Sequence, residues 1–153
     1  MASLKPFRYG VLLRVRQRQE DLKSLALAEM RRAVHTAEEQ HSEIVGEQIA
    51  ALTAAAALTR ERFDASDVRC YFSYERYLSR LAVEKHAELM HLRTQEEVRR
   101  GELEQAMKNR KILERLKEHR DAAYQYELGR EEQHYLDEVA VNRAAMANGQ
   151  RAS

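Results

Sequence analysis

The chain has 153 residues, of which 33% are charged and 7% aromatic, with one Pro, five Gly and no Trp. This length gives room for one domain, and its mix of Ala, Glu, Lys, Leu and Arg is typical of a long helix or coiled coil. A compact core would need more large apolar residues, so the composition predicts a narrow seam between helices. The formal net charge of +1 gives no reason to expect a nucleic-acid partner.

Cysteine usage and hydropathy favour a protein that stays in the cytoplasm. Cys70 is the one cysteine, so no internal disulfide can form and a reducing compartment fits. The apolar run at residues 11–13 is too short for a signal peptide, and no run approaches the ~20 apolar residues of a membrane span.

The first predicted helix covers residues 8–62. Pro6 suits its first turn, where the missing N–H costs nothing, and no strong helix breaker follows before the end of this range. Apolar and small residues recur eleven apart in three rows: Leu22, Ala33, Ile44 and Ala55; Val15, Ala26 and Ala37; Met30, His41 and Leu52. Eleven residues in three turns is close to the period of a straight helix, so these rows predict a seam of small residues.

The turn is predicted at residues 63–67, FDASD, where Asp64 or Ser66 can cap a new helix. A second helix is predicted over residues 68–145, and residues 147–153 are predicted to be disordered. Its heptad row alternates apolar and polar residues, which predicts a weak seam: Leu78, Lys85, Leu92, Arg99, Ala106, Leu113 and Arg120.

Two long helices and one short turn predict an all-α fold, a single antiparallel coiled-coil hairpin domain spanning residues 1–153. A turn centred near residue 65 pairs residues whose numbers add to about 130. Arg8 then lies opposite Ala122, and the rest of the second helix overhangs. The overhang keeps an apolar stripe that needs a partner to bury it: Tyr124, Leu128, Tyr135 and Val139.

The sequence offers weak candidates for metal or catalytic chemistry. Two Glu-x-x-His patterns, Glu38 to His41 and Glu131 to His134, resemble parts of the di-metal sites of four-helix bundles. A hairpin supplies two helices and separates the motifs by ~50 Å or more. We therefore expect no metal site, no cofactor and no catalytic residue, so the protein is predicted not to be an enzyme. A di-metal bundle formed by dimerisation stays an alternative, which bound iron or manganese would reveal.

Two clusters have both a structural and a functional interpretation. A basic run is predicted to lie near two basic residues of the second helix: Arg14, Arg16 and Arg18 near Lys111 and Arg115. These residues form either a solvated face compensated by nearby acids or a basic surface around the base of the hairpin that meets an acidic partner. Three tyrosines after the turn either pack the hairpin tip or form a docking face: Tyr71, Tyr74 and Tyr77.

Three blocks in order resemble the bacterial flagellar export protein FliJ family and its injectisome counterparts. The first is FRYGVLLRVRQRQEDLKSLALAEMRRA, residues 7–33, and the second is the aromatic YFSYERYLSRL, residues 71–81. The third comprises NRKILERLKEH and EEQHYLDEVAVNR, residues 109–119 and 131–143. The resemblance covers almost the whole chain and implies an antiparallel two-helix coiled coil similar to the central stalk of rotary ATPases.

The resemblance also implies partners and a location. The chain ends would bind in the pore of the hexameric flagellar export ATPase and stimulate hydrolysis. The implied ring-binding residues are Phe7, Arg8, Leu12, Leu13, Leu128, Glu132, Gln133, Tyr135, Leu136, Asp137, Glu138 and Arg143. The cytoplasmic part of the export-gate membrane protein would be bound by Gln40, Ile44, Tyr74, Tyr77 and Leu81. Export chaperones are further implied partners, and the implied location is the cytoplasmic side of the inner membrane at the flagellar base.

A different class of protein stays open from the residues alone. In this alternative the chain is a structural coiled-coil homodimer that has no ATPase partner. A second copy would then bury the stripe of the overhang. Mass in solution separates the two hypotheses, because the stalk hypothesis predicts a monomer.

Overall fold

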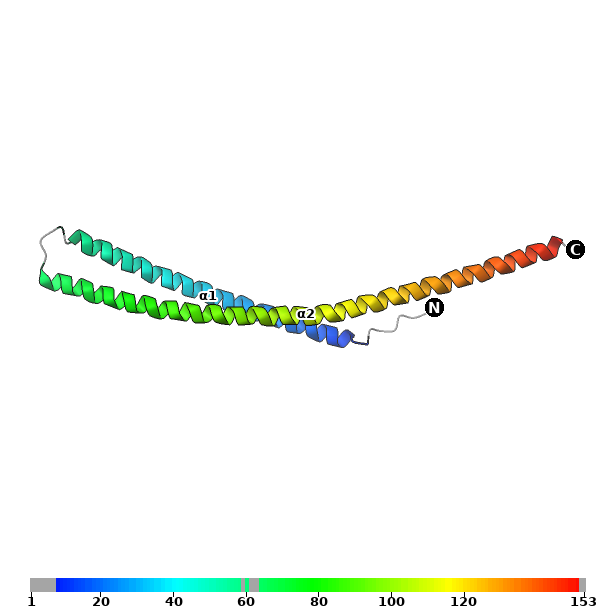
Figure 1. The fold of residues 1–153 in the computed structure, drawn as a ribbon, viewed down its shortest axis with the longest axis horizontal. Coiled ribbons are helices and arrows are strands. Elements are labelled where there is room, and N and C mark those ends of the chain that lie inside the picture. Colours follow the sequence, from blue (N-terminus) through cyan, green and yellow to red (C-terminus); the bar gives the residue numbers. More distant parts are fainter. Residues whose placement is uncertain (1–7, 59, 61–63, 152–153) are drawn as a thin grey trace. The chain divides into compact units, whose positions relative to one another are not determined.

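The computed structural model describes residues 8–58, 60 and 64–151, with backbone alone for residues 147–151. Two helices account for nearly all of these residues: α1, Gly10–Leu58, and α2, Ala65–Arg151 (Figure 1). No strand occurs among the described residues. The all-α fold predicted from the sequence is confirmed.

The chain divides into two compact units. Unit 2 is Gln17–Met107, and unit 1 joins the start of α1, up to Arg16, to α2 from Lys108 onward. The single domain and the overhanging C-terminal helix expected from the sequence stay predictions.

In unit 2, α1 and α2 lie side by side and antiparallel, as a hairpin requires (Figure 1). Four cross-helix pairs of polar side chains set the register: Lys23–Glu102, Arg31–Glu96, Glu38–Arg93 and Gln48–Ser79, whose residue numbers add to 125, 127, 131 and 127. The sequence predicted about 130 for opposing residues. The hairpin and its approximate register are therefore confirmed.

The seam of unit 2 follows a heptad pattern. Its buried residues are Leu27, Val34 and Ala37 from α1 and Leu78 and Leu89 from α2, and Leu92 packs against the cluster of Val34, Ala37 and Leu89. Around them, buried and half-buried positions recur at alternating steps of three and four: 27, 30, 34, 37, 41, 44, 48, 51 and 55 in α1, and 68, 71, 75, 78, 82, 85, 89, 92 and 96 in α2. This period is that of a left-handed coiled coil.

The seam of eleven-residue rows predicted for α1 is wrong in part. Leu22 is 60% exposed and Ala33 is also exposed, although both belong to the predicted rows. One reason is that Gln48, a polar residue, occupies a heptad position and hides the period from a search for apolar and small residues. The heptad row predicted for α2 fares better, because Leu78, Lys85, Leu92 and Ala106 are buried or half-buried, whereas Arg99 is exposed.

The turn delivers the N-cap that the sequence predicted. The Asp64 carbonyl accepts hydrogen bonds from the backbone N–H groups of Asp67, at 3.1 Å, and Val68, at 3.5 Å. Its carboxylate accepts a bond of 3.2 Å from the Ser66 hydroxyl, and Asp67 adds negative charge to the first helical turn. Asp64 is thus the capping residue, and Ser66 lies inside α2.

The helix bounds differ from the expected ranges of 8–62 and 68–145. Helix α1 begins two residues later and ends at Leu58, and of residues 59–63 only Arg60 is described. Helix α2 begins at Ala65 and continues to Arg151, so residues 147–151 are helical where disorder was predicted; residues 152–153 lie outside the described part. Extending an existing helix adds one hydrogen bond per residue without a new nucleation step, and no proline interrupts this end.

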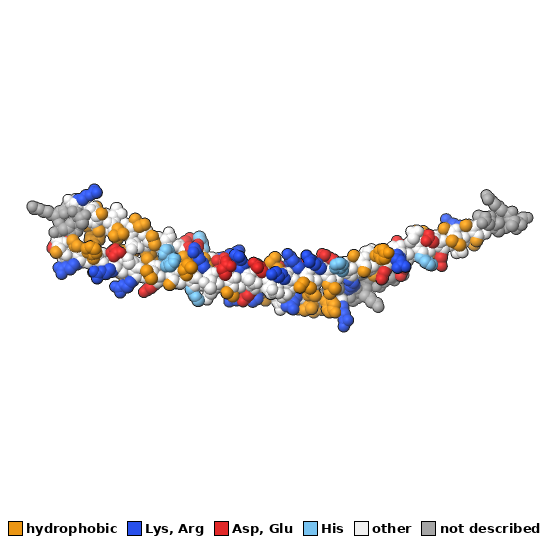
Figure 2. Space-filling model, viewed as in Figure 1, with side chains coloured by type: hydrophobic (Ala, Val, Ile, Leu, Met, Phe, Trp, Pro, Cys, Tyr) orange, Lys and Arg blue, Asp and Glu red, His pale blue; other side chains and the backbone are white. Residues whose placement is uncertain are grey.

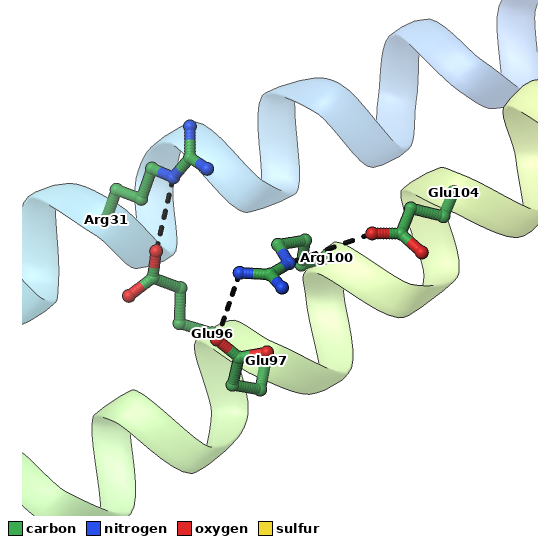
Figure 3. A network of polar contacts seen from close by, with 5 residues as sticks. All are labelled: Arg31, Glu96, Glu97, Arg100 and Glu104. Atoms are coloured by element: carbon green, nitrogen blue, oxygen red, sulfur yellow. Dashed lines mark hydrogen bonds and ion pairs between the residues drawn. The ribbon is translucent and has the colours of Figure 1, made fainter.

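Ion pairs line the exposed flanks of the unit 2 seam. Arg31 Nε lies 3.2 Å from Glu96 across the hairpin, while Arg100 on α2 contacts Glu97 at 3.2 Å and Glu104 at 3.7 Å (Figure 3). Exposed pairs of this kind each contribute about 0–1 kcal/mol. Of these pairs only Arg31–Glu96 joins the two helices, so it alone can favour one register of the hairpin over another.

Candidate partner-binding surface

The first half of the predicted ring-binding set lies at the start of α1, in unit 1. Arg8 and Leu12 are exposed, whereas Leu13 is 9% exposed. The Leu13 N–H donates to the Tyr9 carbonyl at 2.9 Å, and the Arg8 guanidinium lies 5.9 Å from the centroid of the Tyr9 ring. Leu13 therefore anchors this end of α1, and Arg8 and Leu12 face solvent. Phe7 lies outside the described residues.

The second half lies on α2, also in unit 1. Tyr135 is 66% exposed and Leu136 is 59% exposed, and both border a shallow hollow with Glu131 and Glu132. Leu128 is half-buried, and the remaining members of the set are exposed: Glu132, Gln133, Asp137, Glu138 and Arg143. The structure thus presents a largely exposed helical surface on which large apolar side chains alternate with charged ones.

The apolar stripe of this surface extends further than the sequence analysis recognised. Eleven-residue steps link Tyr124, Tyr135 and Met146 in one row and Leu128 and Val139 in another. An eleven-residue repeat stays on one face of a straight helix. Met146 is 72% exposed and belongs to the stripe, although it was not predicted. The signal that identifies it is the same spacing that was sought in the first helix.

The predicted gate-binding residues lie in unit 2. Gln40, Tyr74 and Tyr77 are exposed, the two tyrosines at 46% and 57%, whereas Ile44, which lies in the seam, and Leu81 are half-buried. Tyr71, by contrast, is half-buried. The tip-packing interpretation therefore fits Tyr71, and the docking interpretation fits Tyr74 and Tyr77.

A hollow near the turn escaped the sequence analysis. It has a volume of about 250 Å³ and lies between the end of α1 and the start of α2, lined by Ala51, Leu52, Ala55, Ala56, Val68, Tyr71, Phe72 and Glu75. Small alanines face larger aromatic residues here, which leaves the seam underfilled. Figure 2 shows hydrophobic side chains gathered at this end of the hairpin.

The described residues contain no arrangement with evident catalytic chemistry. No three His, Cys, Asp or Glu side chains among them come together as metal ligands would. His41 and His86 face each other across the seam with ring centroids 5.4 Å apart, but no third ligand joins them. Hydrogen bonds from Lys23 and then from Arg99 hold the pKa of the Glu102 carboxyl below its ordinary value of 4.5.

The sequence profile of the family described as Flagellar FliJ protein matches residues 5–149. The chain belongs to the FliJ family. Membership makes it a component of flagellar biogenesis and protein export, within a family of non-enzymatic proteins. No curated protein and no solved structure shows a significant match to the chain.

Membership in the FliJ family agrees with the two-helix architecture and with the surfaces described above. Within the described part of the chain, neither helix is apolar enough over a sufficient length to cross a membrane. Membership in this family implies that the protein interacts within the flagellar export apparatus.

Proposed function

We propose that this FliJ protein is a stalk that binds the pore of the hexameric flagellar export ATPase and stimulates its hydrolysis of ATP. The observation that carries the proposal is the apolar stripe of α2, in which Tyr135 is 66% exposed and Met146 is 72% exposed while the other members are half-buried. Exposed aromatic and aliphatic rows on a helix lose water favourably against a partner. Family membership makes the export apparatus the place to look for that partner.

Stimulation requires contacts that differ between the nucleotide states of the ring subunits. A ligand shifts an equilibrium only by its differential affinity for the two states. Around any one level of a single helix, six ring subunits meet different side chains. The face of α2 that carries Tyr135 differs in its side chains from the opposite face. Ring subunits of identical sequence therefore contact different side chains of α2.

The same proposal assigns further partners to unit 2. Tyr74, Tyr77 and Gln40 offer exposed side chains to the cytoplasmic part of the export-gate membrane protein, and the half-buried Ile44 and Leu81 complete the proposed set. Export chaperones are additional partners. These contacts would hold the protein at the cytoplasmic side of the inner membrane at the flagellar base, peripherally and as a monomer.

The test compares two tyrosines of similar exposure on opposite faces of α2. Tyr126, which is 70% exposed, lies nine residues before Tyr135, or two and a half turns away. We expect Tyr135→Ala to weaken ring binding roughly ten-fold, as loss of an interface aromatic does. Tyr126→Ala is the matched control and should weaken binding less, because Tyr126 lies opposite the apolar stripe. Equal binding by both variants would contradict a role for the stripe.

A homodimeric scaffold is the competing function, because a second copy can also bury the stripe. Sedimentation of the full chain separates the two proposals. A monomer over the concentration range of the binding assay supports the stalk. A stable dimer that fails to bind the ATPase, and that Tyr135→Ala dissociates, supports the scaffold.

A further inference from the structure

Charge is separated along unit 1. Residues 8–16 and 108–120, which we call the basic collar, hold nine basic and two acidic residues, a net charge of +7: Arg8, Arg14, Arg16, Lys108, Arg110, Lys111, Arg115, Lys117 and Arg120 against Glu114 and Glu118. Residues 121–146, the distal segment, hold six acidic and two basic residues, a net charge of −4: Asp121, Glu127, Glu131, Glu132, Asp137 and Glu138 against Arg130 and Arg143. The overall charge of +1 hides this polarity.

Many of these charges have no ion-pair partner among the described residues. In the collar this holds for Arg8, Arg14, Lys111, Arg115 and Lys117, and in the distal segment for Glu127, Glu131, Glu132 and Glu138, all of them exposed. In unit 2 Lys23, Arg31, Arg93, Arg99 and Arg100 each pair with a glutamate, although other charged residues of that unit also lack an ion-pair partner among the described residues. Unneutralised charges of one sign repel one another, so these two clusters do not serve the stability of unit 1.

The two clusters act as separate electrostatic sites. Residues 114 and 132 mark their approximate centres, and a helix separates such positions by about 27 Å. Screening in physiological salt reduces interactions beyond about 8 Å. A partner therefore meets a positive surface at one level of unit 1 and a negative surface at another.

We propose that unit 1 recognises a protein partner of the opposite polarity: an acidic surface where the collar binds and a basic lining where the distal segment binds. A nucleic acid or an anionic membrane would attract the collar but repel the distal segment of the same unit, which favours a protein. The inference rests on the proposed function, in which this partner is the ATPase ring. Opposed polarity fixes the direction in which α2 enters the pore, because reversed insertion places like charges together.

The experiment uses paired charge reversals in the full chain, each at positions i and i+4 on one helix. Lys111→Glu with Arg115→Glu reverses collar charge, and its control is Arg76→Glu with Arg80→Glu in unit 2. Glu127→Lys with Glu131→Lys reverses distal charge, and its control is Glu43→Lys with Glu47→Lys in unit 2. All eight residues are exposed and have no ion-pair partner among the described residues. Each double substitution replaces two like charges by two like charges of the other sign, so the repulsion between the two positions is unchanged. Circular dichroism checks that the helix content of each variant is that of the wild type.

Binding to the cognate export ATPase ring is then measured at several salt concentrations. We expect wild-type affinity to fall as salt rises, and each unit 1 reversal to weaken binding roughly ten-fold at low salt, because attraction becomes repulsion. The controls should stay within about two-fold of the wild type. If wild-type affinity does not change with salt and the reversals do not weaken binding, the proposed polarity is wrong, while the ring remains the partner. No wild-type binding at any salt would overturn the proposed function, and the polarity with it.

Discussion

Replacing Leu78 by Ala is expected to destabilise the hairpin of unit 2 strongly. Leu78 is 1% exposed, and it is the largest fully buried side chain among the described residues. The substitution removes three buried carbon atoms, each contributing about 0.8 kcal/mol, and core Leu→Ala changes cost about 2–5 kcal/mol. Two helices can partly close a gap, so we expect a loss of about 2–3 kcal/mol, equivalent to a fall in Tm of roughly 5–10 °C.

The matched control is Leu22→Ala, since Leu22 is 60% exposed and belongs to the eleven-residue rows rather than to the heptad seam. Its substitution should cost about 0.5 kcal/mol or less. Urea and thermal unfolding, followed by circular dichroism, give both values. If Leu22→Ala lowers the free energy of unfolding as much as Leu78→Ala does, the heptad seam is wrong and the seam of eleven-residue rows is favoured.

Two further predictions concern single polar contacts of unit 2. Asp64→Ala should lower the stability of the hairpin by roughly 0.5–1 kcal/mol, because it removes a carboxylate whose negative charge favours the start of α2 and which accepts a hydrogen bond from the Ser66 hydroxyl. The backbone bonds to the carbonyl of residue 64 remain. Urea unfolding measures the loss, and Ser73→Ala at an exposed helical position should cost less. Glu102→Gln should lower Tm at neutral pH, because the pKa of Glu102 is held below 4.5 by Lys23 and Arg99 in the folded state. That stabilisation is present above pH 4.5 and is lost as pH falls through the lowered pKa, so the Tm difference should shrink in acid. A Tm difference that grows below pH 4.5 would contradict the assignment.

The sequence predicted the fold class and the pairing of the helices because few breakers interrupt the chain. One turn, with a capping residue at Asp64, leaves a hairpin as the simple arrangement of two long helices. The seam itself was harder to predict. In α1 the positions that face α2 include the polar Gln48, whose side-chain amide donates a hydrogen bond of 2.9 Å to the Ser79 hydroxyl. Such positions show themselves only when the opposing helix is in place.

The candidate partner-binding surface could also be predicted from the sequence only in part. Periodicity predicted that the stripe around Tyr135 needs a partner, and the structure shows that side chain exposed. Spacing alone did not reveal that Leu13 is buried while its neighbour Leu12 faces solvent, because one residue of helical rotation decides the difference. Met146 was missed because residues near a chain end were expected to lie outside the helix. The charges of unit 1 can be counted from the sequence. Only the structure shows that the two basic ranges, residues 8–16 and 108–120, belong to one unit.

ATP hydrolysis by the cognate export ATPase, with and without this protein, tests the central claim most directly. The full chain is compared with a chain that ends at Ala122, which removes the stripe and keeps the whole of unit 2. The account predicts stimulation by the full chain and its loss on truncation. Stimulation that survives truncation would move the contact to the start of α1 or to the hairpin. No stimulation by either chain, together with a stable dimer in sedimentation, would contradict the stalk and favour the scaffold.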